Sequence, residues 1–178
     1  VVDLMLDLVG YKIDKDLTIE RVVEPSVGSG AFVGPVIERL LAARKIHSPD
    51  QSWTGLRDCL RGWDVQPDHI ETCSKLATKL LTDAGCPLKV ADELAATWFT
   101  ADDFILSNRG GWTATLVVGN PPYIRIEEMP ADLLRAYRAA CPAMSGRADI
   151  FVGFIEHGLE MLEPEGRLAY ICADRWMH

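Results

Sequence analysis

A double proline that follows an apolar run constrains the fold of this chain more than any other feature. Residues 115–119 (Thr-Leu-Val-Val-Gly) have the composition of a buried β-strand. Pro121 and Pro122 end that strand, because proline has a fixed φ and no backbone N–H. In an open α/β sheet, ligands bind at the carboxyl ends of the strands. Asn120, the prolyl carbonyls and the Tyr123 ring therefore predict a rigid polar clamp beside a stacking surface, suited to a flat heterocycle with an exocyclic amine.

The rest of the chain alternates strand-like and helix-like segments. Strands are expected at residues 21–25, 59–65, 98–105, 115–119 and 167–172. Helices are expected at residues 1–11, 31–44, 68–84, 87–97, 129–140 and 148–162, and a turn at 163–166 closes the last of them. This alternation predicts an α/β fold, with a mostly parallel sheet flanked by helices and joined by right-handed crossovers.

Composition limits the classes of function. The 178 residues suffice for one domain with a sizeable core, and 48% hydrophobic and 25% charged residues are ordinary for a globular protein. With 26 acidic and 18 basic residues, the net charge of −8 argues against a stand-alone nucleic-acid binder. If the protein acts on nucleic acid, we expect most of the phosphate contacts to lie outside this chain.

The sequence also bears on location and completeness. No apolar run approaches the length of a membrane span, and residues 1–10 lack the basic segment of a signal peptide. The five cysteines form no C-x-x-C pair, which disfavours a zinc site and favours a reducing cytoplasm. The chain starts at Val1 and stops at His178 just past a strand-like run, so we expect a piece of a longer protein.

A glycine turn follows the first expected strand. Gly28 and Gly30 allow the backbone to approach a ligand before a helix N-terminus, although many strand–helix turns contain glycine without binding a cofactor. Glu24 and Pro25 precede this turn. A carboxylate there suits a cationic ligand better than a pyrophosphate, and S-adenosylmethionine carries an ammonium and a sulfonium but no phosphate. The alternative is that Glu24 is a solvent-facing strand end.

Acidic residues end the next two expected strands. Asp64 is placed to hydrogen-bond ribose hydroxyls, although an insertion around residues 48–54 must be assumed because its distance from the glycine turn exceeds the expected value of about twenty residues. A turn or helix-capping aspartate is the alternative. Asp102 or Asp103 could accept a hydrogen bond from an adenine amine, with Phe104 packing on the ring. An acid/base dyad or metal site is disfavoured, since no histidine or further carboxylate recurs at ligand spacing.

In this order, these segments resemble the γ-class N6-adenine DNA methyltransferases of bacterial restriction–modification systems. The matching segments are 1–8 (the end of the N-terminal cofactor motif), 23–32 (motif I), 62–65 (motif II), 103–104 (motif III), 119–123 (motif IV), 147–162 (motif V) and 166–176 (motif VI). Motif IV, Asn-Pro-Pro-Tyr, is the most specific of them. The Thr-Pro that usually precedes the first segment is missing, as are the later motifs and any target recognition domain.

The resemblance implies a Rossmann-like fold of the S-adenosylmethionine-dependent methyltransferases, truncated to a single partial catalytic domain at 1–178. It implies transfer of a methyl group from S-adenosylmethionine to the N6 amine of adenine in DNA, with DNA as the partner of the full-length protein. No metal is required. The implied catalytic residues are Asn120, Pro121, Pro122 and Tyr123. The implied cofactor-binding residues are Glu24, Pro25, Ser26, Gly28, Gly30, Asp64, Val65, Asp103, Phe104, Asn120, Pro122 and Phe154.

Other functions share some of these features. Methyltransferases that act on RNA or on a protein glutamine also use Asn-Pro-Pro-Tyr, because an amide poses the same chemical problem as a base amine. A non-catalytic cofactor-binding module of the same fold is a further alternative. A nicotinamide dehydrogenase is disfavoured, because Gly28-x-Gly30 lacks the full dinucleotide fingerprint.

Overall fold

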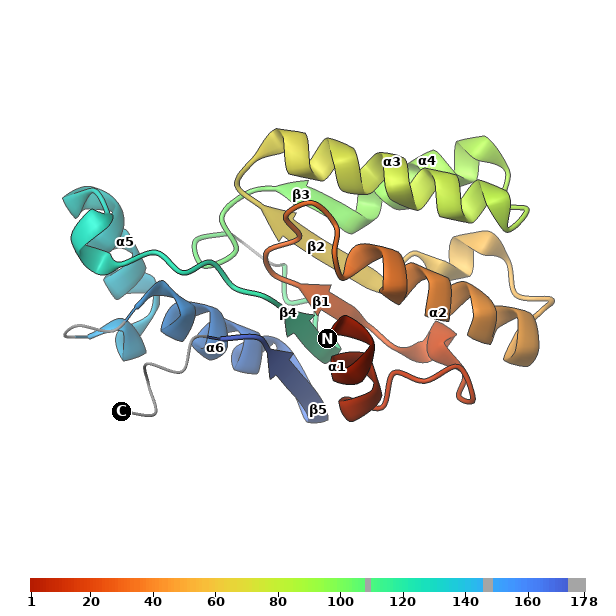
Figure 1. Ribbon diagram of the computed structural model, residues 1–178, viewed down its shortest axis with the longest axis horizontal. Helices are drawn as coiled ribbons and strands as arrows, with labels where there is room; N and C mark the ends of the chain where they lie inside the picture. The colour runs from red at the N-terminus through yellow and green to blue at the C-terminus, as the bar shows by residue number, and fades with distance from the viewer. Residues whose placement is uncertain (108–109, 146–148, 173–178) are drawn as a thin grey trace.

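A five-stranded parallel sheet forms the centre of the molecule (Figure 1). The computed structural model describes residues 1–107, 110–145 and 149–172. The strands are β1 (Val22–Glu24), β2 (Leu60–Asp64), β3 (Phe99–Ala101), β4 (Ala114–Gly119) and β5 (Leu162–Tyr170), and their order in the sheet is β3-β2-β1-β4-β5. Every pairing of neighbouring strands is parallel, so the expected α/β class is confirmed.

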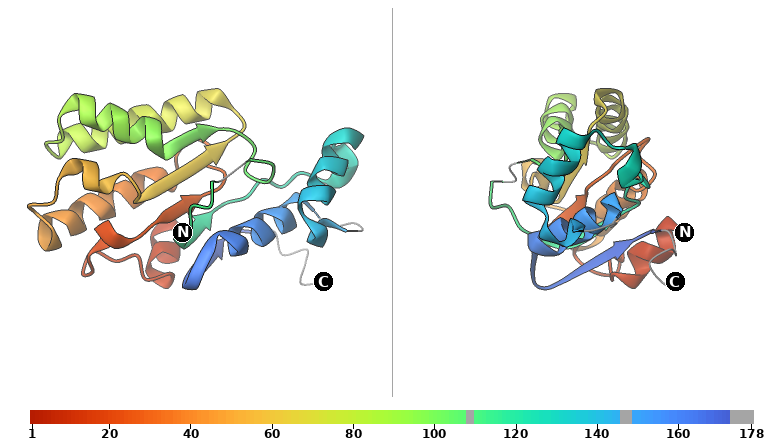
Figure 2. Two further views of the ribbon diagram at one scale, coloured as in Figure 1. Left: turned by 180° about the vertical axis from the view of Figure 1, so that it is seen from behind. Right: turned by 90° about the vertical axis from the view of Figure 1, so that its left-hand side faces the viewer.

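Helices follow β1, β2 and β4 in the chain, and one helix precedes β1. They are α1 (Val2–Leu8), α2 (Val33–His47), α3 (Pro67–Asp83), α4 (Leu88–Trp98), α5 (Ala131–Ala140) and α6 (Ile150–Met161). Short 3-10 turns lie at Leu17–Ile19, Trp53–Leu56, Ile126–Glu128 and Pro142–Met144. Figure 2 shows α5 beyond the carboxyl ends of the strands, and α3 beside α4 along the β3 edge. Within the described ranges, no helix has the length and hydrophobicity that crossing a bilayer requires.

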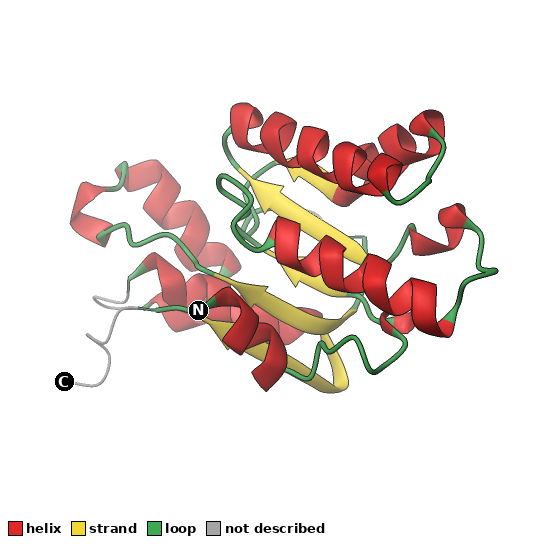
Figure 3. Ribbon diagram, turned by 45° about the vertical axis from the view of Figure 1, so that its right-hand side comes forward, coloured by secondary structure: helices red, strands yellow, loops and turns green. Residues whose placement is uncertain are grey.

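The two faces of the sheet bury separate apolar clusters. Successive side chains of a strand point to opposite faces. Val22 and Leu116 therefore enter a cluster that residues of α1 to α4 complete, with α1 and α2 in front of the sheet in Figure 3. Val23 and Val117 enter the second cluster, which contains side chains of α5 and α6. The first cluster packs α1 to α4 against the sheet, and the second packs α5 and α6 against its other face.

The start of β5 differs from the expected turn. The sequence predicts that residues 163–166 separate the last helix from a strand at 167–172, but β5 begins at Leu162, directly after α6. Leu162 pairs with Ala114, and the ladder resumes with Arg167 opposite Leu116. The turn-forming residues thus lie inside an irregular stretch of the strand, where Glu165 has a positive φ of 68°.

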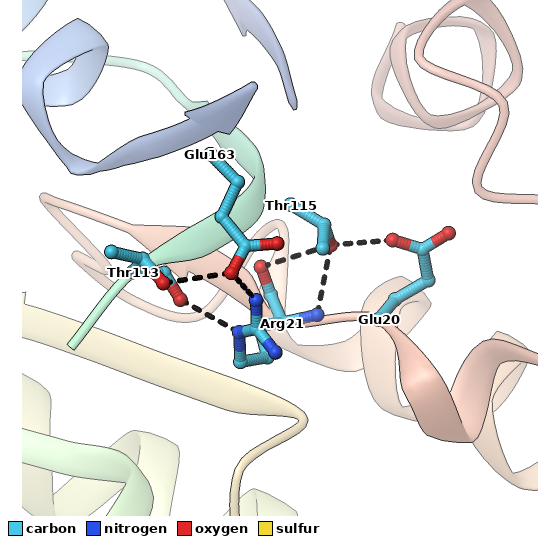
Figure 4. A network of polar contacts seen from close by, with 5 residues as sticks. All are labelled: Glu20, Arg21, Thr113, Thr115 and Glu163. Carbon is cyan, nitrogen blue, oxygen red and sulfur yellow. Dashed lines mark hydrogen bonds and ion pairs between the residues drawn. The ribbon is translucent and has the colours of Figure 1, made fainter. Parts of the chain in front are cut away.

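Polar contacts hold this irregular stretch against the amino-terminal ends of β1 and β4 (Figure 4). Arg21 forms an ion pair with Glu163 and donates from Nε to the Thr113 carbonyl oxygen at 2.8 Å. Thr113 Oγ1 donates to the same Glu163 carboxylate at 2.8 Å. The Thr113 carbonyl, a backbone acceptor beside this irregular stretch, is thus satisfied by a side chain, and the contacts lie at the opposite ends of β1 and β4 from their carboxyl ends.

Candidate functional site

A cavity of about 310 Å³ opens at the carboxyl ends of β1 and β2. Four segments supply its wall: the glycine turn, the end of β2, the turn after β3, and the loop after β4. Side chains of α5 and α6 close it. The lining residues that the sequence predicted are Pro25, Ser26, Gly28, Asp64, Val65, Asp102, Asp103, Phe104, Pro122 and Phe154. Gln66, His69, Ile124, Tyr137 and Ile150 complete the lining.

The glycine turn is packed closely against β2. Gly28 and Gly30 have positive φ angles of 51° and 89°, which favour glycine. The Gly30 N–H donates to the Val27 carbonyl oxygen at 2.9 Å and closes the turn. Val27 then packs over Gly62, where an added Cβ would lie 2.5 Å from Val27 Cγ1. Gly62 therefore allows the glycine turn to pack closely against β2. The motif II match includes Gly62 but does not indicate this packing role.

Asp64 connects the glycine turn to β2. Its side chain is 8% exposed. Oδ2 accepts from the Gly28 N–H at 2.9 Å, and Oδ1 accepts from the Gln66 N–H at 2.9 Å. Each carboxylate oxygen has two acceptor positions, so both retain capacity for ligand hydroxyls. His69 Nδ1 lies 3.1 Å from Oδ1, which brings to the site a histidine that the sequence did not single out.

Glu24 lies buried at the end of β1. It is 2% exposed, and its Oε2 has no hydrogen-bond partner among the described residues. Burial raises the pKa of Glu24 well above its ordinary value, and the negative charge of Asp64 raises it further. The alternative of a solvent-facing strand end is wrong, because all three residues of β1 are buried. A buried carboxyl with an unpartnered oxygen fits a cationic group that approaches from the neighbouring cavity.

Asp103 begins the turn after β3, and its carboxylate is extensively bonded. Oδ1 accepts from the Ile105 N–H at 2.9 Å and the Leu106 N–H at 3.2 Å. Oδ2 accepts from the Tyr137 hydroxyl at 2.5 Å. Asp102 is exposed and lies on the rim of the same cavity. Both acids therefore reach the site, but only Asp103 is fixed by several donors.

Aromatic rings form the apolar wall next to Asp103. Phe104 and Phe154 are stacked, with ring centroids 5.6 Å apart and planes at 20°. Trp63 meets Phe104 edge-on, also with centroids 5.6 Å apart. Offset and edge-to-face pairs are favourable arrangements of aromatic quadrupoles. The cavity thus combines a carboxylate with an aromatic surface, a pairing suited to a planar ring that carries an N–H donor.

The loop after β4 lies at the same edge of the sheet and is more exposed. Pro121 is buried and Pro122 lines the cavity, whereas Asn120 is exposed and Tyr123 is 50% exposed. The Tyr123 hydroxyl lies 2.8 Å from Asn120 Oδ1 and 3.0 Å from the Ile171 carbonyl oxygen, and it can donate its single hydrogen to either.

Two arginines that follow this loop in the sequence are candidates for contacts with nucleic-acid phosphate. Arg125 is exposed on the loop, whereas Arg147 lies outside the described residues. In the described part of the chain, no three His, Cys, Asp or Glu side chains are grouped to hold a metal ion.

Solved structures of methyltransferases have a fold similar to that of this chain. A putative class I S-adenosylmethionine-dependent methyltransferase from Listeria monocytogenes aligns over 97% of this chain and 46% of its own, with a TM-score of 0.59 and 15% identity. The M protein of the Type I restriction enzyme EcoKI aligns over 92% of this chain and 32% of its own, with a TM-score of 0.53 and 16% identity. The expected methyltransferase fold is confirmed.

Comparisons of sequence identify the family. The Type II methyltransferase M.PaeR7I of Pseudomonas aeruginosa is 41% identical over 99% of this chain, and M.XhoI of Xanthomonas vasicola is 39% identical over 99%. The chain spans about a third of the length of these curated relatives, 31% and 32% respectively. The family model described as Eco57I restriction-modification methylase matches residues 64–178. Since this match covers more than half of the chain, the protein belongs to the Eco57I restriction-modification methylase family.

Proposed function

We propose that this chain is the catalytic core of a restriction–modification DNA methyltransferase that methylates the N6 amine of adenine. The observation that carries the proposal is the Asn120–Tyr123 loop at the carboxyl edge of the sheet, next to a cavity lined by Asp64, Asp103 and Phe104. Residues 1–178 form one part of the catalytic domain, and target recognition lies in other parts of the protein. The net charge of −8 supports this division, because phosphate neutralisation requires cations from elsewhere.

The cofactor is S-adenosylmethionine, whose sulfonium supplies the methyl group. Residues in and beside the cavity fit its parts. Glu24 is buried next to Pro25 of the lining, its Oε2 has no hydrogen-bond partner among the described residues, and it would take the ammonium. Asp64 would accept from the ribose hydroxyls, and Asp103 from the adenine amine, with the stacked Phe104 and Phe154 beside the ring.

The substrate side must make a poor nucleophile reactive. An adenine amine delocalises its lone pair into the ring. Asn120 Oδ1 and the Pro121 carbonyl would accept its two N–H bonds, which localises the lone pair and stabilises the positive charge that develops on the nitrogen. The base leaves the duplex to reach this loop, and the Tyr123 ring would stack on it. The Tyr123 hydroxyl can then turn from Asn120 toward the Ile171 carbonyl oxygen, which lies 3.0 Å away.

Product analysis tests this function. The full-length protein is incubated with S-adenosylmethionine carrying a labelled methyl group and with DNA, RNA or a glutamine-containing peptide, and the methylated product is digested and identified. We expect N6-methyladenine in DNA only. Label in cytosine, in RNA or in glutamine would overturn the substrate assignment, and binding of S-adenosylmethionine without transfer to any of them would favour a non-catalytic module.

A further inference from the structure

Tyr137 of α5 reaches into the cavity from an element to which the sequence assigned no role in the site. The residue is 5% exposed, and its ring belongs to the same apolar cluster as Phe104 and Phe154. Its hydroxyl donates to Asp103 Oδ2 at 2.5 Å, the short distance of a bond between a hydroxyl and a carboxylate. A buried tyrosine hydroxyl needs a partner, and here that partner is the acid beside the aromatic wall.

The acceptor positions of Asp103 are nearly filled. A carboxylate has about four lone-pair sites. The Ile105 and Leu106 N–H groups occupy those on Oδ1, and the Tyr137 hydroxyl occupies one on Oδ2. One site on Oδ2 remains, in a residue that lines the cavity. Tyr137 therefore helps to determine how the remaining acceptor site is presented to a ligand.

The phenol of Tyr137 is held in its donating form. Burial raises its pKa above the ordinary value, and the hydrogen bond to Asp103 and the negative charge of that residue raise it further. A protonated phenol next to a carboxylate can only donate to it, so the direction of this bond is fixed at neutral pH.

The position of α5 in the chain extends the consequence of this bond to the catalytic loop. The loop starts at Gly119, where β4 ends, and α5 begins at Ala131. Pro122 and Ile124 of the loop line the same cavity as Tyr137. The sheet thus anchors one end of the loop, and the hydrogen bond from Tyr137 to Asp103 anchors the helix that follows its other end.

We propose that Tyr137 is a positioning residue that orients Asp103 toward the cofactor's adenine amine and, through α5, links cofactor binding to the catalytic loop. The inference rests on the proposed function, because it takes Asp103 as the acceptor of that amine. It adds a residue of α5 to the cofactor site. It also gives a physical connection between the cofactor cavity and the catalytic loop.

A comparison of tyrosine variants in the full-length protein tests the inference. Tyr137→Phe removes only the hydroxyl. Tyr11→Phe is the matched control, because Tyr11 is also buried and donates its hydroxyl to the Val36 carbonyl oxygen at 3.3 Å, outside the cavity lining. We expect Tyr137→Phe to weaken S-adenosylmethionine binding about tenfold, since hydrogen bonds to charged groups are among the stronger ones. Tyr11→Phe should leave that affinity within about twofold of the wild type, because its lost bond is distant from Asp103.

Two readouts separate positioning from a general structural effect. The first is selectivity against an S-adenosylmethionine analogue in which a carbonyl oxygen replaces the adenine amine. Tyr137→Phe should reduce this selectivity, whereas a stability defect alone leaves it unchanged. The second is an Asp103→Ala background, in which Tyr137→Phe should have no further effect on affinity, since the two residues act together.

The outcomes are distinguishable. Absence of S-adenosylmethionine binding by the wild type overturns the cofactor assignment and this inference with it. Wild-type binding with unchanged affinity and selectivity in Tyr137→Phe overturns only the inference, as does a full additional loss of affinity when Tyr137→Phe is added to Asp103→Ala. Hydrogen exchange of residues 131–140 that slows on cofactor binding in the wild type, and not in Tyr137→Phe, supports the link to the loop.

Discussion

The acid-lined wall of the cavity and the catalytic loop lie at the same edge of the sheet, yet they are held in different ways. Backbone N–H groups fix both oxygens of Asp64 and one oxygen of Asp103, so these carboxylates are set by the fold itself. On the loop, Asn120 is exposed, and its Oδ1 lies 2.8 Å from the Tyr123 hydroxyl of the same loop, which can donate to it or to the Ile171 carbonyl oxygen. A side chain that a neighbour occupies must change partners when a substrate arrives, whereas one held by backbone does not.

This difference indicates that the acid-lined wall and the loop have different tasks in the site. Preorganised acceptors lower the reorganisation that accompanies binding, which suits a cofactor that must occupy one pose. An exposed loop with a rotatable hydroxyl suits a base that enters from outside and leaves after reaction. Substitutions among the cofactor-binding residues and on the loop test this division.

Replacement of Asn120 should have the largest effect, and it should lower catalysis without a comparable loss of cofactor affinity. In the full-length protein, Asn120→Ala should lower kcat for methylation by about 10²–10³, the effect of removing one preorganised group that contacts the charge developing in the transition state. S-adenosylmethionine affinity should stay within a few-fold, because Asn120 is exposed and its proposed contact is with the target amine and not with the cofactor. Single-turnover methylation and calorimetry on the same preparation check both. An equal loss in cofactor affinity would show that the loop and the cavity are one unit.

Replacement of Glu24 tests the cofactor-binding part of the site. Glu24→Gln should weaken S-adenosylmethionine binding by about 1–3 kcal/mol, because the charged partner of the ammonium is lost. The exposed Glu38 of α2 provides the control, since Glu38→Gln makes the same chemical change away from the cavity. Unchanged affinity in Glu24→Gln, or an equal loss in both variants, would contradict the role of Glu24.

The raised pKa of Glu24 gives this variant a second signature. A carboxyl whose pKa is higher in the folded than in the unfolded protein makes unfolding easier as the pH rises above its ordinary value of 4.5. The folded protein without cofactor should therefore lose this contribution to stability between pH 4.5 and the raised pKa. Glu24→Gln should lack that loss, so the difference in free energy of unfolding between the variant and the wild type should grow with pH in this window. Denaturant unfolding at several pH values measures it.

The sequence predicted the scaffold better than the contacts within the site. Alternating apolar segments and turn residues predicted a segment that overlaps each described strand and α-helix, because hydrophobic periodicity is a local property. The contact between Tyr137 and Asp103 is not local, since it depends on how α5 packs against the turn after β3. Nor could periodicity show that Glu24 Oε2 has no donor among the described residues or that β5 begins directly after α6, because both follow from neighbours distant in the sequence.

Gly62 tests how the glycine turn depends on β2. In Gly62→Ala the new Cβ would meet Val27 Cγ1 at 2.5 Å and Phe99 Cδ1 at 2.9 Å. Such overpacking should destabilise the fold by about 1–3 kcal/mol and displace the turn, which also weakens cofactor binding. Gly34→Ala in α2 is the control, because its Cβ would have ordinary contacts at 3.8 Å, and it should stabilise the helix by about 0.5–1 kcal/mol. Equal stability of the two variants would contradict the need for close approach at Gly62.

Tyr123 provides the finest test, because two substitutions separate its ring from its hydroxyl. Tyr123→Ala should weaken capture of the target base by about 1–3 kcal/mol, the range found for stacking on aromatic side chains.

Tyr123→Phe keeps the ring and removes only the hydroxyl that lies between Asn120 and the Ile171 carbonyl oxygen. We expect it to change KM for DNA by less than about threefold, since an exposed hydroxyl that exchanges between protein and water contributes little net free energy. Asn120 Oδ1 is then free before the base arrives, so kcat should be unchanged or slightly higher. Steady-state methylation with a DNA duplex measures both constants, and a loss in Tyr123→Phe as large as that in Tyr123→Ala would mean that the hydroxyl, and not the ring, holds the loop in its active form.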